Sequence, residues 1–269
     1  MLNQYGVGIS LNTNAFLLND KLIEDLLKKE IDRIEISLYS LNPEIHNCLR
    51  NTERAFEKAY GAIEKILKRK KEMNLKTDII VAFLLNKHNI DEMEEYIKHF
   101  SNLGVWTTIQ SLDYNIQSLD DEKNCSLNDA QSVNDELWVY DKVKIDIAFN
   151  RLYTMKREGY LIYNRVEQFK MMKKYYLREC NDILKLPCYS GQNNLIINSK
   201  GEGFFCFRGP CIGNFVNDDV KNIWKSKRSK NIRKQIKTCP KPCRMMNCNY
   251  SNSLFRKSVD YINRHILKK

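Results

Sequence analysis

Cysteine side chains gather in the last third of this 269-residue chain. Four thiolates that converge on one point can hold a [4Fe–4S] cluster or a structural Zn²⁺ ion. Zinc ribbons usually present two CxxC pairs, whereas the gaps here are CxxxxC and CxxxC, so the spacing favours iron–sulfur and leaves zinc open. The cysteines of this region are Cys188, Cys206, Cys211, Cys239, Cys243 and Cys248.

The compartment in which the protein is expected determines whether these thiols form disulfides or stay reduced. The start of the chain, "MLNQYGVGIS", has no signal peptide pattern, and no apolar run approaches the roughly 18 residues of a membrane span. We therefore expect a cytoplasmic protein with no membrane partner, in which thiols stay reduced and serve metal or redox chemistry more than disulfides.

The cysteine count predicts one cluster, because six cysteines fall short of the eight that two all-thiolate clusters need. Which candidate is left over stays open, as does the role of Cys211. Cys48, Cys125 and Cys180 are expected to be buried core residues. The expected metal ligands are Cys188, Cys206, Cys239, Cys243 and Cys248.

The net charge of +11 raises the question of a nucleic-acid partner. Lysines are spread along the expected helices and often alternate with acids, and no aromatic motif of an RNA-binding module accompanies them. A solvated surface is therefore favoured over nucleic-acid binding, and an acidic or phosphorylated partner stays open.

The first 112 residues alternate between strand and helix patterns, which predicts βαβ units with a parallel sheet. Asn19 or Asp20 is expected to cap the first helix, and Pro43 to occupy the first turn of another. The first strand is expected to be buried. The strands are expected at 6–13, 31–40, 77–86 and 105–112, and the helices at 19–30, 52–73 and 89–104.

Ligands of parallel sheets bind at the carboxyl ends of the strands. Here those ends read "SLNTN", "SLYS", "FLLN" and "QSLDY", which are rich in hydroxyls and amides, so a binding rim is expected there. Asn12, Thr13 and Asn86 lie at these ends, where capping of a local turn is an equally good interpretation. His46 is expected to be packed or at the surface.

Shorter elements follow the sheet region. A loop is expected at 113–131, helices at 132–158 and 165–184, a short strand at "YLIYN", a hairpin at 194–207 turned at 199–201, and an amphipathic helix at 218–237. Because glycines and cysteines cluster from Cys188 on, we expect two domains, 1–184 and 185–269.

The C-terminal features occur in an order that resembles the SPASM domain, the auxiliary-cluster module of many radical S-adenosylmethionine (AdoMet) enzymes. Cys188 is followed by a glycine before Cys206, by "IGN" and "IWKS", by Arg233 and by the last cysteine group. The N-terminal half resembles the barrel of the same enzymes in "SLNTNAFLLND", "IEISLYSLNPEIHNCLR" and "IIVAFLLNKHNIDEMEEYIKHFSNLGV", and "MKREGYLIYN" resembles the linker.

The resemblance implies an α/β fold: a partial (β/α) barrel of the radical SAM type without its first two βα units, followed by a small cysteine-rich α+β domain. It implies that Ser37 and Arg50 hold the carboxylate of AdoMet, with Asn86 as a third cofactor contact, since a guanidinium binds a carboxylate in a bidentate fork. The alternative is that Ser37 caps a turn and Arg50 pairs with Glu53 or Glu57.

The family motif CxxxCxxC, which holds the catalytic cluster, does not occur in this sequence. We therefore expect a fragment or a split subunit that is inactive alone, with an unpaired first strand that another polypeptide could cover. Intact relatives modify a peptide or a small molecule. Two alternatives are an iron–sulfur electron-transfer or accessory subunit and a zinc-stabilised nucleic-acid-binding protein.

Overall fold

The computed structural model describes residues 7–112, 136–179, 181–192 and 194–245. By its contacts the chain divides into two compact units. Unit one contains 7–112 and 136–169, and the described part of unit two is 170–245. The division expected at 184/185 stays a prediction about domains.

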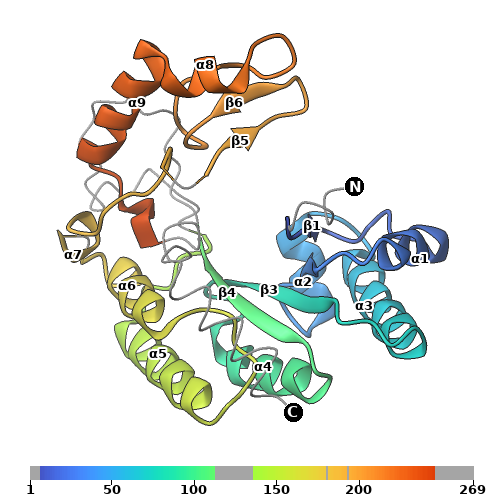
Figure 1. The fold of residues 1–269 in the computed structure, drawn as a ribbon. Helices are drawn as coiled ribbons and strands as arrows, with labels where there is room; N and C mark the ends of the chain where they lie inside the picture. The colour runs from blue at the N-terminus through green and yellow to red at the C-terminus, as the bar shows by residue number, and fades with distance from the viewer. Residues whose placement is uncertain (1–6, 113–135, 180, 193, 246–269) are drawn as a thin grey trace. The chain divides into compact units, whose positions relative to one another are not determined.

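Unit one is built on a four-stranded parallel sheet in the order β1–β2–β3–β4 (Figure 1). Its register pairs Ile34 with Leu11 on one side and with Ile79 on the other. The alternation of strands and helices predicted this parallel sheet, which is confirmed. The strands are β1 (Ser10–Thr13), β2 (Arg33–Ser37), β3 (Asp78–Leu85) and β4 (Trp106–Ser111).

Local signals in the sequence set the helix boundaries of this unit. Asn19 caps α1 by accepting from the Leu22 amide at 2.9 Å, and Pro43 opens α2, both as predicted. Gly104, at φ 72°, follows the end of α4. The helices are α1 (Asp20–Lys28), α2 (Pro43–Arg50), α3 (Ala55–Glu72), the 3₁₀ turn η2 (Ile90–Glu92), α4 (Met93–Asn102) and α5 (Lys142–Arg157).

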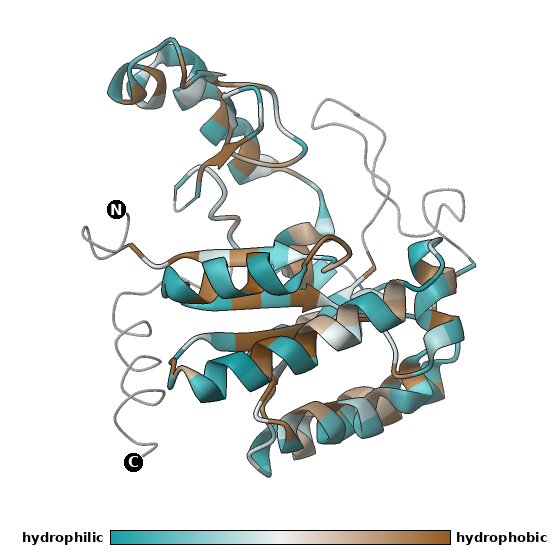
Figure 2. Cartoon of the chain, turned by 90° about the vertical axis from the view of Figure 1, so that its right-hand side faces the viewer, coloured by the Kyte–Doolittle hydropathy of each residue, from teal (hydrophilic) through white to brown (hydrophobic). Residues whose placement is uncertain are grey.

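The core of unit one lies between the sheet and its helices. Six of the eight residues of β3 are buried, including Val81 and Phe83 at 0% exposure. Figure 2 shows the matching pattern on the helices, which carry hydrophilic and hydrophobic residues on different faces. Tyr96 and Phe100 of α4 stack on this core with ring centroids 4.7 Å apart.

Two expectations about this unit were wrong in detail. The first strand begins at Ser10 and has no buried residue, because among the described strands it pairs with β2 alone. The helix expected over 132–158 begins at Lys142, where Asp141 caps it by accepting from the amides of Val143 and Lys144. Residues 132–135 and the loop expected at 113–131 lie outside the described residues.

The short strand predicted at "YLIYN" extends the sheet beyond β4 as a single bridge between Thr107 and Ile162. Asn164 continues this pairing with its side chain. Its Oδ1 accepts from the Ile109 amide at 2.6 Å and its Nδ2 donates to the Ile109 carbonyl at 2.9 Å.

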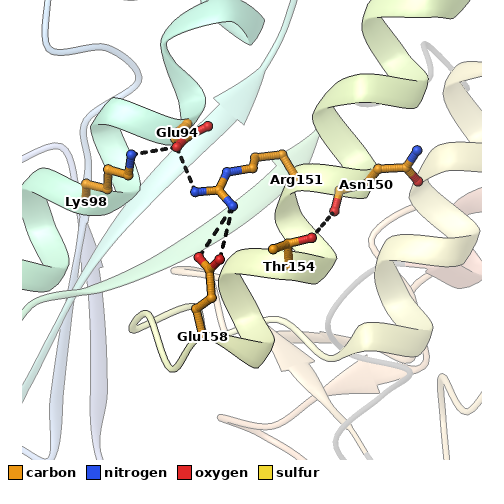
Figure 3. A network of polar contacts seen from close by, with 6 residues as sticks. All are labelled: Glu94, Lys98, Asn150, Arg151, Thr154 and Glu158. Carbon is orange, nitrogen blue, oxygen red and sulfur yellow. Dashed lines mark hydrogen bonds and ion pairs between the residues drawn. The ribbon is translucent and has the colours of Figure 1, made fainter.

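A charged network joins α4 to α5 (Figure 3). Arg151 donates to Glu94 at 2.8 Å and to Glu158 at 3.3 Å, and Lys98 lies 2.6 Å from Glu94. Hydrogen bonds from Arg151 and Lys98 lower the pKa of Glu94 to about 2. The network therefore fixes α5 against α4 on the outside of the sheet.

The helix expected over 165–184 is interrupted, since Arg178 takes a left-handed conformation at φ 62°. The predicted hairpin is confirmed: β5 and β6 are antiparallel, and β7 adds a third strand. The amphipathic helix expected at 218–237 breaks at Ser226, which caps α9 through the Ser229 amide. The elements are α6 (Val166–Tyr176), α7 (Asn181–Leu184), β5 (Ile196–Ile197), β6 (Glu202–Phe204), β7 (Gly213–Asn214), α8 (Val220–Lys225), α9 (Lys227–Thr238) and the 3₁₀ turn η3 (Pro242–Met245).

The core of unit two is small and lies under α8 and α9. Cys188 and Cys206 pack against it, half-buried. The buried residues of this core are Phe205, Ile212, Ile223, Ile232 and Ile236.

None of the described helices combines the length and apolar character that crossing a membrane requires.

Candidate metal centre and strand-end rim

The loop after β2 is held rigidly by side chains from α2, η2 and α4. The Tyr39 amide donates to Nδ1 of His46 at 3.0 Å, and the Tyr96 hydroxyl donates to the Leu38 carbonyl at 2.5 Å. Nδ2 of Asn89 donates to the Tyr39 carbonyl at 2.7 Å and to the Leu84 carbonyl at 2.8 Å, so one amide ties the ends of β2 and β3 together.

His46 is 1% exposed and serves this loop as a neutral acceptor. Burial, and then the nearby Arg50 cation, lower the pKa of His46 to about 4. Its Nδ1 accepts the hydrogen bond of the Tyr39 amide, so the ring hydrogen of the neutral imidazole is on Nε2. The expectation of a packed histidine is confirmed.

Arg50 lies at the rim but in neither of the two ion pairs considered from the sequence. Its Nη1 donates to the Tyr39 hydroxyl at 2.9 Å, and its guanidinium lies 5.4 Å from the centre of the Tyr39 ring. Ser37 is the last residue of β2 and is half-buried. Their contact with AdoMet stays a prediction.

Asn86 is fully buried at the end of β3 and closes the turn there. Its Nδ2 donates to the Leu84 carbonyl at 2.7 Å, and its Oδ1 accepts from the His88 amide at 2.9 Å. Both ends of the amide are thus used by the turn, as the capping interpretation predicted. A cofactor contact for Asn86 stays a prediction.

A polar pair that the sequence did not single out lies on the face of the sheet opposite Ile34 and Ile36. Nε2 of Gln110, in β4, donates to the Glu35 carboxylate, in β2, at 3.0 Å, so the hydrogen bond passes over β3. Burial raises the pKa of Glu35, against the opposing effect of the Arg33 cation. Alternating burial along β2 is the signal that could have found this half-buried carboxyl.

Four of the five predicted metal ligands form one electrostatic group in unit two. Burial raises the pKa of Cys243 to about 12, and negative charge on Cys206, Cys239 and Cys188 adds to the rise. Burial also raises the pKa of Cys206, again with contributions from Cys188 and Cys239. Cys243 and Cys206 therefore lie within electrostatic reach of Cys188 and Cys239, although the four cysteines come from three separate segments of the chain.

Cys206 begins a turn that suits a thiolate ligand. The Arg208 amide donates to its Sγ at 3.5 Å, and the Gly209 amide donates to its carbonyl at 3.0 Å. An N–H bond to sulfur favours the thiolate over the thiol.

Two arginines hold the cysteine-bearing segments in place. Nη1 of Arg244 donates at 2.6 Å to the carbonyls of Leu184 and Leu186, just before Cys188, and its Nη2 donates to the Cys239 carbonyl. Arg233 lies between two aromatic rings of the core and donates to the Gly191 carbonyl at 2.7 Å. Arg233 entered the sequence-based expectations only through the SPASM resemblance, and no motif pointed to Arg244.

The remaining cysteines are placed differently. Cys211 is half-buried and its thiol donates to the Gly213 carbonyl at 3.4 Å. Cys48 is exposed, so the expectation that it is a core residue was wrong: His46 is the buried residue of α2, and Cys48 lies on the outer side of that helix. Cys125, Cys180 and Cys248 lie outside the described residues.

The donor set fits a metal in its chemistry. Within the described ranges, no three His, Cys, Asp or Glu side chains already stand at metal-binding geometry. Half-buried thiols and an amide hydrogen bond to the sulfur of Cys206 are nevertheless the chemical features that thiolate ligands need.

Comparison with protein families matches two models to this chain. The radical SAM superfamily matches residues 2–100, and the iron–sulfur cluster-binding domain named SPASM matches residues 188–249. The second match contains all six clustered cysteines.

Individual relatives agree at low identity. The GTP 3′,8-cyclase of Aquifex aeolicus (strain VF5) is 23% identical over 242 residues, which are 85% of this chain and 68% of the cyclase. The AdoMet-dependent heme synthase of Methanosarcina barkeri (strain Fusaro / DSM 804) is 21% identical over 82% of this chain and 61% of the synthase.

A solved structure shares the fold. It is anSMEcpe with bound AdoMet and the Cp18Cys peptide, with a TM-score of 0.55 and 15% identity over 96% of this chain and 74% of that one. The α/β fold of a partial barrel with a small second domain is thus the fold of this chain as well.

Proposed function

Because this chain belongs to the radical SAM/SPASM proteins, we propose that its second unit holds one [4Fe–4S] cluster through Cys188, Cys206, Cys239 and Cys243, with Cys248 as the fifth candidate. The observation that carries the proposal is the match of residues 188–249 to the iron–sulfur cluster-binding domain. Two of its thiols, Cys206 and Cys243, have a pKa raised first by burial and then by charge on neighbouring thiols, which supports it. When bound, such a cluster supplies one-electron redox chemistry. In this proposal the cysteines supply the thiolates, and the Arg208 amide donates a hydrogen bond to Sγ of Cys206.

The strand-end rim of unit one is proposed to bind AdoMet. Arg50 is fixed by the Tyr39 hydroxyl and ring, so its guanidinium is ordered before a carboxylate arrives. Ser37 adds a hydroxyl at the end of β2, and Asn86 keeps the adjacent turn closed. This division of roles supports a binding surface made of Ser37 and Arg50 on a loop held by His46 and Asn89.

The overall activity is proposed to be the radical modification of a peptide or a small molecule. A peptide-bound structure among the similar folds supports the first and the GTP 3′,8-cyclase supports the second. In the family the three thiolates of CxxxCxxC start this chemistry, and the printed sequence has no such motif. That the chain works as a fragment or split subunit stays a prediction.

The cluster proposal is tested by anaerobic reconstitution with iron and sulfide of the wild-type chain and two cysteine variants. Cys206→Ser is expected to lose most of the bound iron and of the absorbance near 400 nm. Cys48→Ser is the matched control, because Cys48 is exposed on α2 in unit one, and it is expected to keep both. Equal iron in the two variants would contradict the assignment of Cys206.

The same reconstitution separates the two alternatives. A zinc-stabilised protein would bind about one zinc and no sulfide through the same thiolates. An electron-transfer or accessory subunit would assemble the cluster but bind no AdoMet. Equilibrium dialysis with radiolabelled AdoMet, comparing wild type with Arg50→Ala, tests that point: the wild type is expected to bind and the variant to bind at least tenfold more weakly.

A further inference from the structure

Positive charge is concentrated in one short segment of unit two. Ten of the 44 lysines and arginines and none of the 33 acidic residues lie between Val220 and Met245. This segment therefore carries +10 of the net +11 of the chain, and the rest is nearly neutral. Lysines were expected to be spread along helices and often to alternate with acids, and in this segment no acid accompanies them.

Within α9 the charges form a stripe. At about 100° per residue, Lys227, Lys230, Lys234 and Lys237 fall within about 80° of one another on the helix. All four are exposed, whereas Ser229, Ile232 and Ile236 are buried on the opposite side. We call these four residues the lysine stripe.

The lysine stripe opposes the stability of its own helix. Like charges three and four residues apart on a helix repel one another and destabilise it. None of the four lysines forms an ion pair with a carboxylate in the described part of the chain. A negatively charged partner would remove this repulsion.

The stripe lies close to the candidate metal centre. The buried side of α9 packs on the core that Cys188 and Cys206 contact, and the helix ends at Thr238, next to Cys239. The lysine stripe is thus on a helix whose other side packs on the same core as two of the thiols. Beside Cys206, Phe207 is 82% exposed, which adds an apolar contact to the charged ones.

We propose that the lysine stripe and Phe207 form the docking surface for an acidic one-electron carrier protein that exchanges electrons with the cluster. Transient redox complexes use small interfaces in which complementary charge sets the association rate. In the transfer the carrier loses one electron and the cluster gains one, and no bond breaks. Single-stranded nucleic acids stack successive bases on several aromatic rings, whereas this surface presents only Phe207 and Trp224 packs on Phe205, so a carrier is favoured over RNA.

The proposal rests on the proposed cluster, and the experiment separates the two. The full chain is reconstituted, its iron and sulfide are counted, and its reduction is followed by anaerobic stopped flow. The reductants are a plant-type [2Fe–2S] ferredoxin, which is acidic, and the photogenerated 5-deazariboflavin radical, which is small and uncharged. The test variant is Lys227→Glu/Lys230→Glu/Lys234→Glu, and the control makes the same charge change on α3 as Lys58→Glu/Lys68→Glu/Lys71→Glu.

At low ionic strength, the stripe variant is expected to be reduced by ferredoxin at least tenfold more slowly than wild type, with most of the difference lost in 0.5 M salt. Reduction by deazariboflavin should be unchanged, and the α3 control should match wild type with both reductants. Ferredoxin rates that are equal in wild type and the stripe variant would overturn the proposal.

Two further outcomes are decided by the same proteins. If no cluster assembles, the proposed function fails, and titration calorimetry of the metal-free chain with ferredoxin still tests docking: salt-sensitive binding that the stripe variant loses supports it, and no binding overturns it. If tRNA binds wild type more tightly than ferredoxin does and blocks reduction by ferredoxin, the surface belongs to nucleic acid and the proposal is wrong.

Discussion

His46 makes the stability of unit one depend on pH in a way that can be calculated. Burial lowers its pKa from 6.5 to about 4, so the folded chain holds the ring neutral while the unfolded chain protonates it first. The stabilising contribution is therefore complete above about pH 6.5 and is lost as pH falls toward 4. With these two pKa values, the free energy of unfolding drops by about 2 kcal/mol between pH 7 and pH 5.

The variant His46→Gln separates the loss of stability caused by protonation of His46 from the contributions of other titrating groups. The variant loses the ring that accepts from the Tyr39 amide and lies 5.6 Å from the Tyr39 ring, so it should be about 1–3 kcal/mol less stable at pH 7. Because the variant lacks the titrating ring, its free energy of unfolding should not show the part of the pH dependence that comes from His46. The difference between wild type and variant should therefore shrink by about 2 kcal/mol at pH 5.

Urea unfolding at the two pH values, followed by circular dichroism, measures both effects. NMR titration of the histidine Cε1–H signals, with the His46 signal assigned by its absence from the variant, measures the pKa directly. A His46 pKa near 6.5, or an equal loss of stability in wild type and variant between pH 7 and pH 5, would refute the reasoning.

Three other changes test the packing around the sites. Arg244→Gln should weaken iron binding by the reconstituted chain at least tenfold, because it frees the carbonyls that join two cysteine-bearing segments; unchanged iron content in a chelator competition would argue against that role. Gly203→Ala should destabilise unit two, since an added Cβ would lie 2.0 Å from the Phe215 ring, and Gly203→Ala/Phe215→Ala should recover part of the loss in a thermal melt. Glu94→Gln should cost about 0.5 kcal/mol at pH 7 because its half-exposed partners are screened by solvent, and this cost should vanish as pH falls from about 4.5 to 2; a cost that persists at pH 2 would contradict it.

The sequence predicted those features of the fold that short segments determine. Asn19, Pro43 and Gly104 mark helix boundaries with their own side chains or backbone freedom, and the structure has those boundaries. The strand expected at 77–86 is β3, and most of its apolar residues are buried. The parallel sheet followed from the alternation of elements alone.

Features that depend on distant neighbours were not predictable from the sequence. The exposure of β1 depends on which strands lie beside it, and no pattern within its four residues reveals that. Ser226 breaks a pattern that is helical in periodicity, because its hydroxyl caps the next helix. Cys48 was expected to be a core residue because its sequence context does not show which side of α2 is buried, and the structure turns His46 toward the core instead.

The candidate sites divide in the same way. Cysteine spacing and the SPASM resemblance predicted the metal ligands, and that assignment stays a prediction; charge on Cys188, Cys206 and Cys239 raises the pKa of Cys243. The residues that hold the sites in place, such as Asn89 and Arg244, were missed because each acts on backbone carbonyls far away in the sequence. No periodicity or motif marks a single asparagine or arginine for such a role.

The central claim is that unit two is an iron–sulfur domain, and metal stoichiometry tests it most directly. The full chain is purified without oxygen, reconstituted and desalted, and its iron, acid-labile sulfide and zinc are counted, with EPR after dithionite reduction. The account predicts about four irons and four sulfides per chain and a reduced-cluster signal. One zinc per chain with no sulfide would contradict it.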